Sequence, residues 1–188
     1  MIRSFLAVDL PQAVKNRLLE VQALLKPGTS GIKWVKADQV HLTLKFLGAI
    51  SEETAGQIAA ALSRTVPGYR PFDLILQGVG GFPNIRRPRV IWAGLGGNRE
   101  ALKNLWLHLE EACFEWGIPR ETRPFNPHLT LGRNKTGVPN EQLFLRLANW
   151  SEPDSGPFAV REVVLFRSDL KPGGPVYTVI NTFPLTGT

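Results

Sequence analysis

The tetrapeptide His41-Leu42-Thr43-Leu44 occurs a second time as His128-Leu129-Thr130-Leu131, 87 residues further along the chain. The chain has 188 residues and only three histidines, so two of the three stand in the same four-residue string. Chance repetition of such a string is rare, and self-similarity of this kind is typical of a repeated structural unit. The surroundings of the two copies therefore predict the fold.

Turn residues and apolar periodicity divide the chain into two similar halves, each with a helix, a motif strand, a second helix and further strands. Strands are expected at residues 2–10, 32–35, 40–48, 72–79, 89–95, 127–133, 158–170 and 175–185. Helices are expected after Pro11, Ser51, Asn98 and Pro139. This order indicates an α+β fold of two pseudo-symmetric lobes, each an antiparallel sheet with helices packed outside, with an active-site cleft between them. Because no linker separates the halves, we expect residues 1–188 to form a single two-lobed domain.

The composition is that of a soluble globular protein, with 43% apolar and 20% charged residues. The net charge is +6, the basic excess lies before residue 137, and such a balance favours an anionic partner such as nucleic acid. The single cysteine, Cys113, excludes an internal disulfide, and no apolar run is long enough to span a membrane. The first apolar stretch is too short for a secretory signal, because Asp9 and Pro11 interrupt it. We therefore expect a cytoplasmic protein.

The repeated motif combines two kinds of side chain on opposite faces of a strand. Alternation places His41 and Thr43 on one face and Leu42 and Leu44 on the other, where the leucines anchor the strand to the core. Two such strands that meet across a cleft bring two imidazoles and two hydroxyls around one point. One imidazole can act as general base and the other as general acid, while the hydroxyls donate to an oxyanion. This set suits in-line displacement at phosphorus without a metal or cofactor.

Three alternatives remain open on the residues alone. Each His-Thr pair is also compatible with a strand that carries no chemistry, since threonine is common in strands. An RNA-binding module would use the histidines only to contact phosphate. A metal-dependent phosphohydrolase would need a third ligand, because catalytic zinc usually has three protein ligands, and no third His, Cys, Asp or Glu accompanies the pair.

The paired strings "HLTLKFLG" and "PHLTLGR" resemble the H-x-T-x motifs of the two-histidine phosphoesterase superfamily. Within it, the chain is similar to the RNA 2′,3′-cyclic phosphodiesterases, also called 2′-5′ RNA ligases. The resemblance spans nearly the whole chain, because "RSFLAVDLP", "IKWVKADQVHLTLKFLG", "PRVIWAGL" and "FNPHLTLGR" occur in the expected order. The doubled motif is specific, whereas the flanking strings alone would be weak.

The resemblance implies that the protein opens a 2′,3′-cyclic phosphate at an RNA end to give a 2′-phosphate, without metal or cofactor. The family's second name adds reversible 2′-5′ RNA ligation. By similarity, His41 is the proton donor to the departing 3′ oxygen and His128 is the proton acceptor that activates water. Thr43 and Thr130 are implied to hold phosphate oxygens, and Arg133 matches a basic family position near the phosphate.

Three residues that follow the motifs are candidates for substrate binding. Strict alternation from His128 aims Arg133 away from the cleft, so its implied role requires a bulge or a strand end that turns it back. Phe46 holds the corresponding place in the first copy, where it can either stack on a base or pack in the core. Lys45 is the residue that strict alternation places on the face of His41.

The expected partner is RNA with a 2′,3′-cyclic phosphate end, or a small cyclic nucleotide, and we expect a monomer. If both imidazoles serve one displacement, their reacting nitrogens must lie within about 10 Å of each other. The Gly-rich segment 78–81 is expected to be a bulge or bend rather than a dinucleotide loop. Further cleft candidates without an assigned role are Arg86, Arg87, Arg89, Trp92 and Tyr177.

Overall fold

The computed structural model describes residues 1–151 and 155–188. The helices are α1 (Gln12–Leu25), α2 (Glu52–Thr65), α3 (Arg99–Phe114) and α4 (Glu141–Ala148), with short 3-10 turns η1 (Ala37–Gln39) and η2 (Val66–Gly68). The strands are β1 (Ile2–Val8), β2 (Ile32–Trp34), β3 (Leu42–Ile50), β4 (Phe72–Phe82), β5 (Val90–Gly97), β6 (His128–Asn134), β7 (Phe158–Val160), β8 (Glu162–Lys171) and β9 (Gly174–Pro184).

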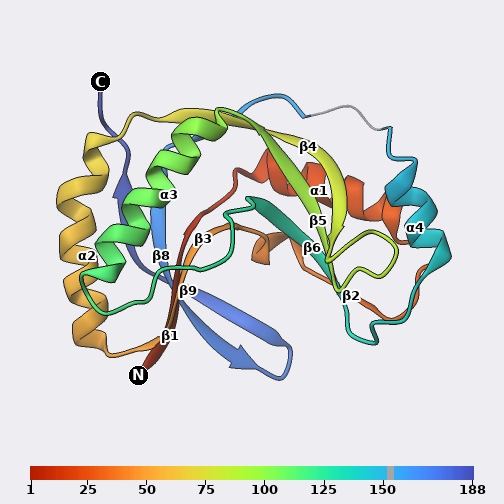
Figure 1. Ribbon diagram of the computed structural model, residues 1–188, viewed down its shortest axis with the longest axis horizontal. Coiled ribbons are helices and arrows are strands. Elements are labelled where there is room, and N and C mark those ends of the chain that lie inside the picture. Colours follow the sequence, from red (N-terminus) through yellow and green to blue (C-terminus); the bar gives the residue numbers. More distant parts are fainter. Residues whose placement is uncertain (152–154) are drawn as a thin grey trace.

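The strands form one antiparallel sheet in the order β7-β4-β5-β6-β3-β1-β8-β9, and β2 pairs with β6 off this path (Figure 1). We call β1, β3, β8 and β9 the first half-sheet, and β2, β4, β5, β6 and β7 the second half-sheet. A single residue pair between β3 and β6, Leu42 opposite Leu129, joins the two. The predicted α+β class with two antiparallel lobes is confirmed, and the two motif strands are themselves the junction between the lobes.

The helices cover the outer face of the curled sheet, with α2 and α3 over the first half-sheet and α1 and α4 over the second (Figure 1). The side chain of Ser51 caps α2 by accepting from Thr54 N, and Asn98 caps α3 in the same way. The start expected at Pro139 is two residues early, because Asn140 caps α4 and the helix begins at Glu141. As predicted, the motif leucines are buried in the main core beneath these helices: Leu42, Leu44, Leu129 and Leu131.

Two features of the strands bear on the sequence interpretation. Residues 158–170 were expected to be one strand, but the chain divides at Arg161: β7 pairs with β4 at one edge of the sheet, whereas β8 pairs with β1 in the other half. No turn residue marks this division, since it depends on which strands lie alongside. The bulge expected at 78–81 is confirmed, because Gly78 has a φ of +69° and the β4–β5 register shifts between Leu76 and Val79.

Cys113 lies buried in α3, and burial raises the pKa of its thiol to about 12. The thiol is therefore protonated at neutral pH and is a poor nucleophile. Among the residues that the structure describes, no helix is both long enough and apolar enough to cross a membrane.

Candidate active site

The two motif histidines lie at the junction of the half-sheets. His41 immediately precedes β3, and His128 is the first residue of β6. Because β3 and β6 are antiparallel at the pair Leu42 and Leu129, continuing that register by one residue in each direction sets Thr43 toward His128 and His41 toward Thr130. In that register His41 and His128 are diagonal neighbours, and residues so related are about 7–8 Å apart, with their Cβ atoms somewhat closer. That spacing lets both imidazoles reach oxygens on a single phosphorus atom.

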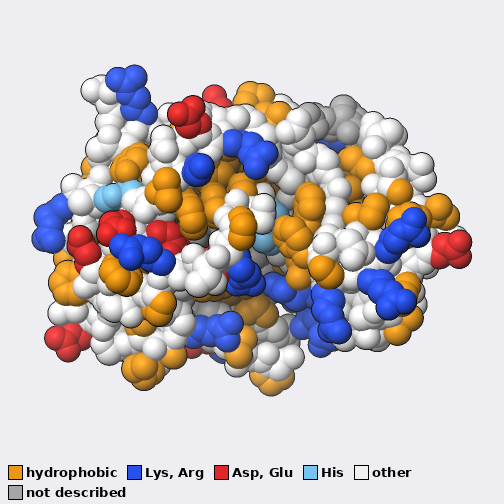
Figure 2. Space-filling view, viewed as in Figure 1, with side chains coloured by type: hydrophobic (Ala, Val, Ile, Leu, Met, Phe, Trp, Pro, Cys, Tyr) orange, Lys and Arg blue, Asp and Glu red, His pale blue; other side chains and the backbone are white. Residues whose placement is uncertain are grey.

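Figure 2 shows histidine atoms at the bottom of a hollow near the centre of one face of the molecule. Apolar side chains line the hollow on both sides, and Lys and Arg side chains gather below it in this view. His41 and His128 are both only partly buried, so neither imidazole is sealed in the core. We call this hollow between the half-sheets the cleft.

Both imidazoles are held in the same way by the backbone. His41 Nδ1 lies 2.9 Å from the carbonyl oxygen of Gln39, and His128 Nδ1 lies 2.7 Å from that of Asn126. In each case the acceptor is two residues upstream of the histidine. Since a carbonyl oxygen only accepts, each Nδ1 carries the proton and donates. Nε2 is therefore the nitrogen that each histidine offers to a substrate.

Aromatic rings fix the orientation of the imidazoles. The ring of His41 stacks on Phe5, with centroids 4.7 Å apart, and meets Tyr177 edge-on at 5.1 Å. The ring of His128 meets Phe82 edge-on at 5.0 Å. Tyr177 was a cleft candidate from the sequence, but Phe5 and Phe82 were not. Side chains alternate between the two faces of the strands that carry Phe5 and Phe82. That pattern does not tell which face of β1, or which end of β4, borders the motif, and only the tertiary structure shows it.

Each copy of the motif carries a shift in strand register at its fourth residue, Leu44 or Leu131. In the pairing of β1 with β3, Leu6 is opposite Lys45 and Ala7 is opposite Thr43, so Leu44 is the extra residue. In the pairing of β5 with β6, Leu131 is the extra residue in the same way. An extra residue reverses the alternation of side chains beyond it. The repeat of sequence is therefore also a repeat of backbone irregularity.

The shift in β6 turns Arg133 toward the cleft, as its implied role required. A Cβ built on Gly132 would lie against Ile32 and Trp34 in the core, so the next residue, Arg133, faces the opposite side. Arg133 is exposed. Its charge is close enough to lower the pKa of both His41 and His128.

The shift in β3 has the same effect on the residues after the first motif copy. Phe46 is 62% exposed and its ring lies 6.1 Å from that of Phe5, on the cleft face. Phe46 thus occupies in the first half-sheet the position that Arg133 occupies in the second.

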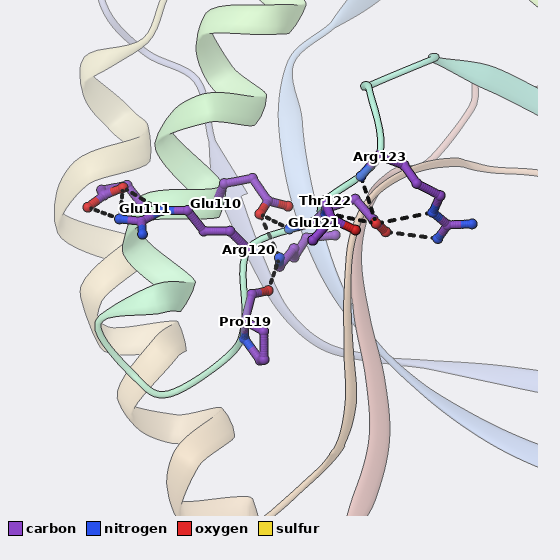
Figure 3. Close-up of polar contacts among 8 residues, drawn as sticks. Glu110, Glu111, Pro119, Arg120, Glu121, Thr122 and Arg123 are labelled. Carbon is purple, nitrogen blue, oxygen red and sulfur yellow. Dashed lines mark hydrogen bonds and ion pairs between the residues drawn. The ribbon is translucent and has the colours of Figure 1, made fainter.

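The expectation that Lys45 faces the cleft beside His41 is wrong. The extra residue Leu44 turns Lys45 to the helix side, where its side chain is 4% exposed. Its Nζ donates to Glu110 Oε2 at 2.7 Å and to the carbonyl oxygen of Pro119 at 2.6 Å (Figure 3). Lys45 therefore holds α3 and the segment after it, on the face of β3 away from the cleft.

The threonine hydroxyls are free to bind a ligand. Thr43 and Thr130 are partly buried on the cleft face, and neither hydroxyl has a hydrogen-bond partner within residues 1–151 and 155–188.

The basic turn between β4 and β5 carries Arg86, which was a cleft candidate from the sequence. The guanidinium of Arg86 lies 4.8 Å from the ring centroid of Phe144 on α4, so it packs on a helix.

Burial is the main influence on both imidazoles, and it lowers the pKa of each below the usual value. For His41, the Gln39 carbonyl and Asp9 oppose the effect, while Arg133 and Lys15 reinforce it. For His128, the Asn126 carbonyl opposes it and Arg133 reinforces it. A bound phosphate would act in the other direction, because an anion favours the imidazolium. Burial therefore favours the neutral form of both imidazoles, and an anionic substrate helps one of them to carry a proton.

The effect of Arg133 on the histidines can be measured directly. Arg133→Gln removes a cation, which disfavours an imidazolium, so the pKa of His41 and of His128 should both rise. NMR titration of the imidazole Hε1 signals in the free protein measures all three histidines at once. His108 is an internal control, since its pKa is lowered by burial and raised by Glu115, without a contribution from Arg133. Unchanged titration of both motif histidines would place Arg133 outside the cleft.

Within the described residues, no group of three or more His, Cys, Asp or Glu side chains could hold a metal ion together.

A model of the LigT-like phosphoesterase family matches residues 8–92 and 96–177 and includes both motif histidines. The chain belongs to the LigT-like phosphoesterase family.

Relatives in this family match the chain over nearly its full length. Among these relatives are two proteins that are both named RNA 2′,3′-cyclic phosphodiesterase. The protein of Methanothermobacter thermautotrophicus is 35% identical over 184 residues, which is 98% of this chain and 99% of the relative. The protein of Thermus thermophilus is 38% identical over 190 residues, which is 99% of this chain and 91% of the relative.

Solved structures of LigT-like proteins share the fold. A crystal structure of a Thermus thermophilus protein has a TM-score of 0.82 and 36% identity, and covers 99% of both chains. Escherichia coli LigT in complex with 3′-AMP has a TM-score of 0.79 and 30% identity, and covers 98% of both chains. The family expected from the doubled motif is confirmed.

Proposed function

We propose that this protein hydrolyses the 2′,3′-cyclic phosphate at an RNA end to a 2′-phosphate, without a metal or cofactor. The observation that carries the proposal is the matched pair of histidines. Each has Nδ1 on a backbone carbonyl, and neither Nε2 has a hydrogen-bond partner among the residues that the structure describes. The names of the relatives support the choice of substrate. Reversible 2′-5′ RNA ligation is the second activity that the proposal includes. In it, a 5′-hydroxyl attacks phosphorus in place of water and the same 3′ oxygen departs, which leaves a 2′-5′ phosphodiester.

In the proposed reaction, a water molecule attacks phosphorus in line with the bond to the 3′ oxygen. His128 Nε2 accepts a proton from the water as the new P–O bond forms. His41, protonated at Nε2, donates its proton to the 3′ oxygen as that bond breaks. The products are a 2′-phosphate and a 3′-hydroxyl, and proton exchange with solvent restores both imidazoles. The assignment of donor and acceptor follows the family resemblance.

The remaining groups are proposed to bind the substrate around this axis. The hydroxyls of Thr43 and Thr130 donate to non-bridging phosphate oxygens, and the guanidinium of Arg133 balances their negative charge. Phe46 is proposed to stack on a base, which its exposed position on the cleft face supports.

Incubation of the pure protein with adenosine 2′,3′-cyclic phosphate tests the function. We expect release of adenosine 2′-phosphate, identified by ³¹P NMR, at a rate that EDTA does not change. Binding without turnover would favour the RNA-binding module. Turnover that EDTA abolishes and zinc restores would favour a metal-dependent phosphohydrolase, and a 3′-phosphate product would reverse the assigned leaving group.

The cellular setting is also part of the proposal. We propose a cytoplasmic protein that acts as a monomer on RNA ends or small cyclic nucleotides. The lone buried Cys113 supports a reducing compartment. We further propose that residues 1–188 act as one functional domain, since both half-sheets contribute histidines to the cleft.

A further inference from the structure

The two walls of the cleft differ in chemistry beyond the motif. On the first half-sheet, one cross-strand row runs through Phe46, Phe5, Phe166 and Val179. The ends of this row are exposed, with Phe46 at 62% and Val179 at 54%. This row forms an apolar wall of the cleft, and the ring of Phe5 in it stacks on the ring of His41.

On the second half-sheet, a cross-strand row places two cations side by side. Lys33 of β2 is directly opposite Arg133 of β6 in the antiparallel register. Paired residues point to the same face of a sheet, and the neighbours of Lys33 on β2, Ile32 and Trp34, pack against the core. Lys33 therefore shares the cleft face with Arg133.

The side chain of Lys33 extends toward the other wall. Its Nζ is 4.0 Å from the position of a Cβ built on Gly174, at the turn of the β8–β9 hairpin. Gln39 of η1 also contacts this hairpin, because its Nε2 donates to the carbonyl oxygen of Pro175 at 2.7 Å. Lys33 thus lies between β2 and the β8–β9 hairpin.

Neither cation is neutralised by the protein. In the part of the chain that the structure describes, Lys33 and Arg133 have no acidic partner within ion-pair distance and no side-chain hydrogen bond. Like charges directly opposite each other destabilise a sheet. An anion held between the two side chains would remove that repulsion and gain two charge-assisted contacts.

We infer that Lys33 binds a second phosphate, the phosphodiester on the 5′ side of the terminal nucleotide, and that the cleft continues there as a track for single-stranded RNA. The inference rests on the proposed function, which places the terminal phosphate at the histidines and Arg133. Lys33 is one strand spacing, about 4.8 Å, from Arg133 across the antiparallel pair, and its side chain reaches toward the β8–β9 hairpin of the opposite wall. Unpaired bases face the apolar wall while the phosphates face the basic wall.

Two substrates isolate this contact. Adenosine 2′,3′-cyclic phosphate has only the terminal phosphate, whereas the dinucleotide ApA with a 2′,3′-cyclic phosphate end adds the 5′ phosphodiester. Lys33→Met should lower kcat/KM for the dinucleotide about fivefold, near the upper range for an exposed ion pair. It should leave the mononucleotide unchanged. It should also reduce the salt dependence of the dinucleotide reaction by about 0.7 in log–log slope.

The controls separate this inference from the function on which it rests. Lys33→Arg should retain the wild-type ratio between the two substrates. Lys103→Met removes an exposed lysine from α3 and should change neither reaction. Equal loss on both substrates, or no loss on either, would overturn the second phosphate site. Failure of the wild type to hydrolyse either substrate would instead overturn the proposed function.

Discussion

Replacement of His41 or of His128 by alanine should lower the rate of cyclic phosphate hydrolysis by about 100-fold to 10,000-fold, because each variant removes a general acid or a general base. Both changes should leave the fold intact, since both side chains are only partly buried and lie outside the main core. Steady-state kinetics with adenosine 2′,3′-cyclic phosphate measures the loss, and circular dichroism checks the fold.

His108→Ala is the matched control. His108 lies on α3, with Nε2 2.8 Å from Thr65 Oγ1 and its ring beside Tyr69, away from the cleft. It should retain wild-type activity. The double variant at His41 and His128 should lose far less than the product of the two single losses, because groups that act in one step are not additive. Near-wild-type turnover in either single variant would contradict the two-histidine mechanism.

The same variants assign the two roles. A cyclic substrate with sulfur in place of the 3′ oxygen has a leaving group that needs little protonation, since a thiol has a pKa of about 8.5. With this substrate, His41→Ala should lose much less activity than it does with the oxygen substrate. His128→Ala should lose as much as before. The opposite pattern would exchange the donor and the acceptor.

Much of the fold and of the site can be predicted from the sequence because the doubled motif combines local and long-range information. Alternation within each copy predicts buried leucines, and the duplication predicts that the two copies meet. What alternation cannot predict is where it breaks. For Arg133, strict alternation conflicts with the role that the family resemblance implies, so a bulge was required. The register shift at Leu131 provides that bulge.

The first motif copy carries the same shift without any such conflict in the sequence. Strict alternation there gave a plausible basic residue on the cleft face, Lys45, so nothing called for a bulge at Leu44. A comparison of the two motif copies could have revealed the bulge in the first copy. If Arg133 is turned to the cleft, the residue at the same place in the first copy, Phe46, must be turned as well, and Lys45 must be buried.

The place where Lys45 lies accounts for the second large effect that we expect. Its ammonium and the Glu110 carboxylate are 4% and 7% exposed, and they are 2.7 Å apart. Glu110 Oε2 also accepts from the backbone N–H of Glu121 at 2.9 Å (Figure 3). The pair thus joins β3 and α3 to residues 119–121 of the segment that leads to His128.

Lys45→Met should reduce the free energy of unfolding by about 3–5 kcal/mol, because it leaves the Glu110 carboxylate buried without a counter-ion. Urea unfolding followed by circular dichroism measures the loss. Lys45→Met combined with Glu110→Met removes both charges and should recover part of it, although Pro119 O and Glu121 N–H then lack their partners. If Lys45→Met were as stable as the wild type, the buried pair would contribute nothing to the fold. At a temperature where the variant is still folded, its KM for the cyclic phosphate should be unchanged, whereas a lysine that bound substrate would raise KM when removed.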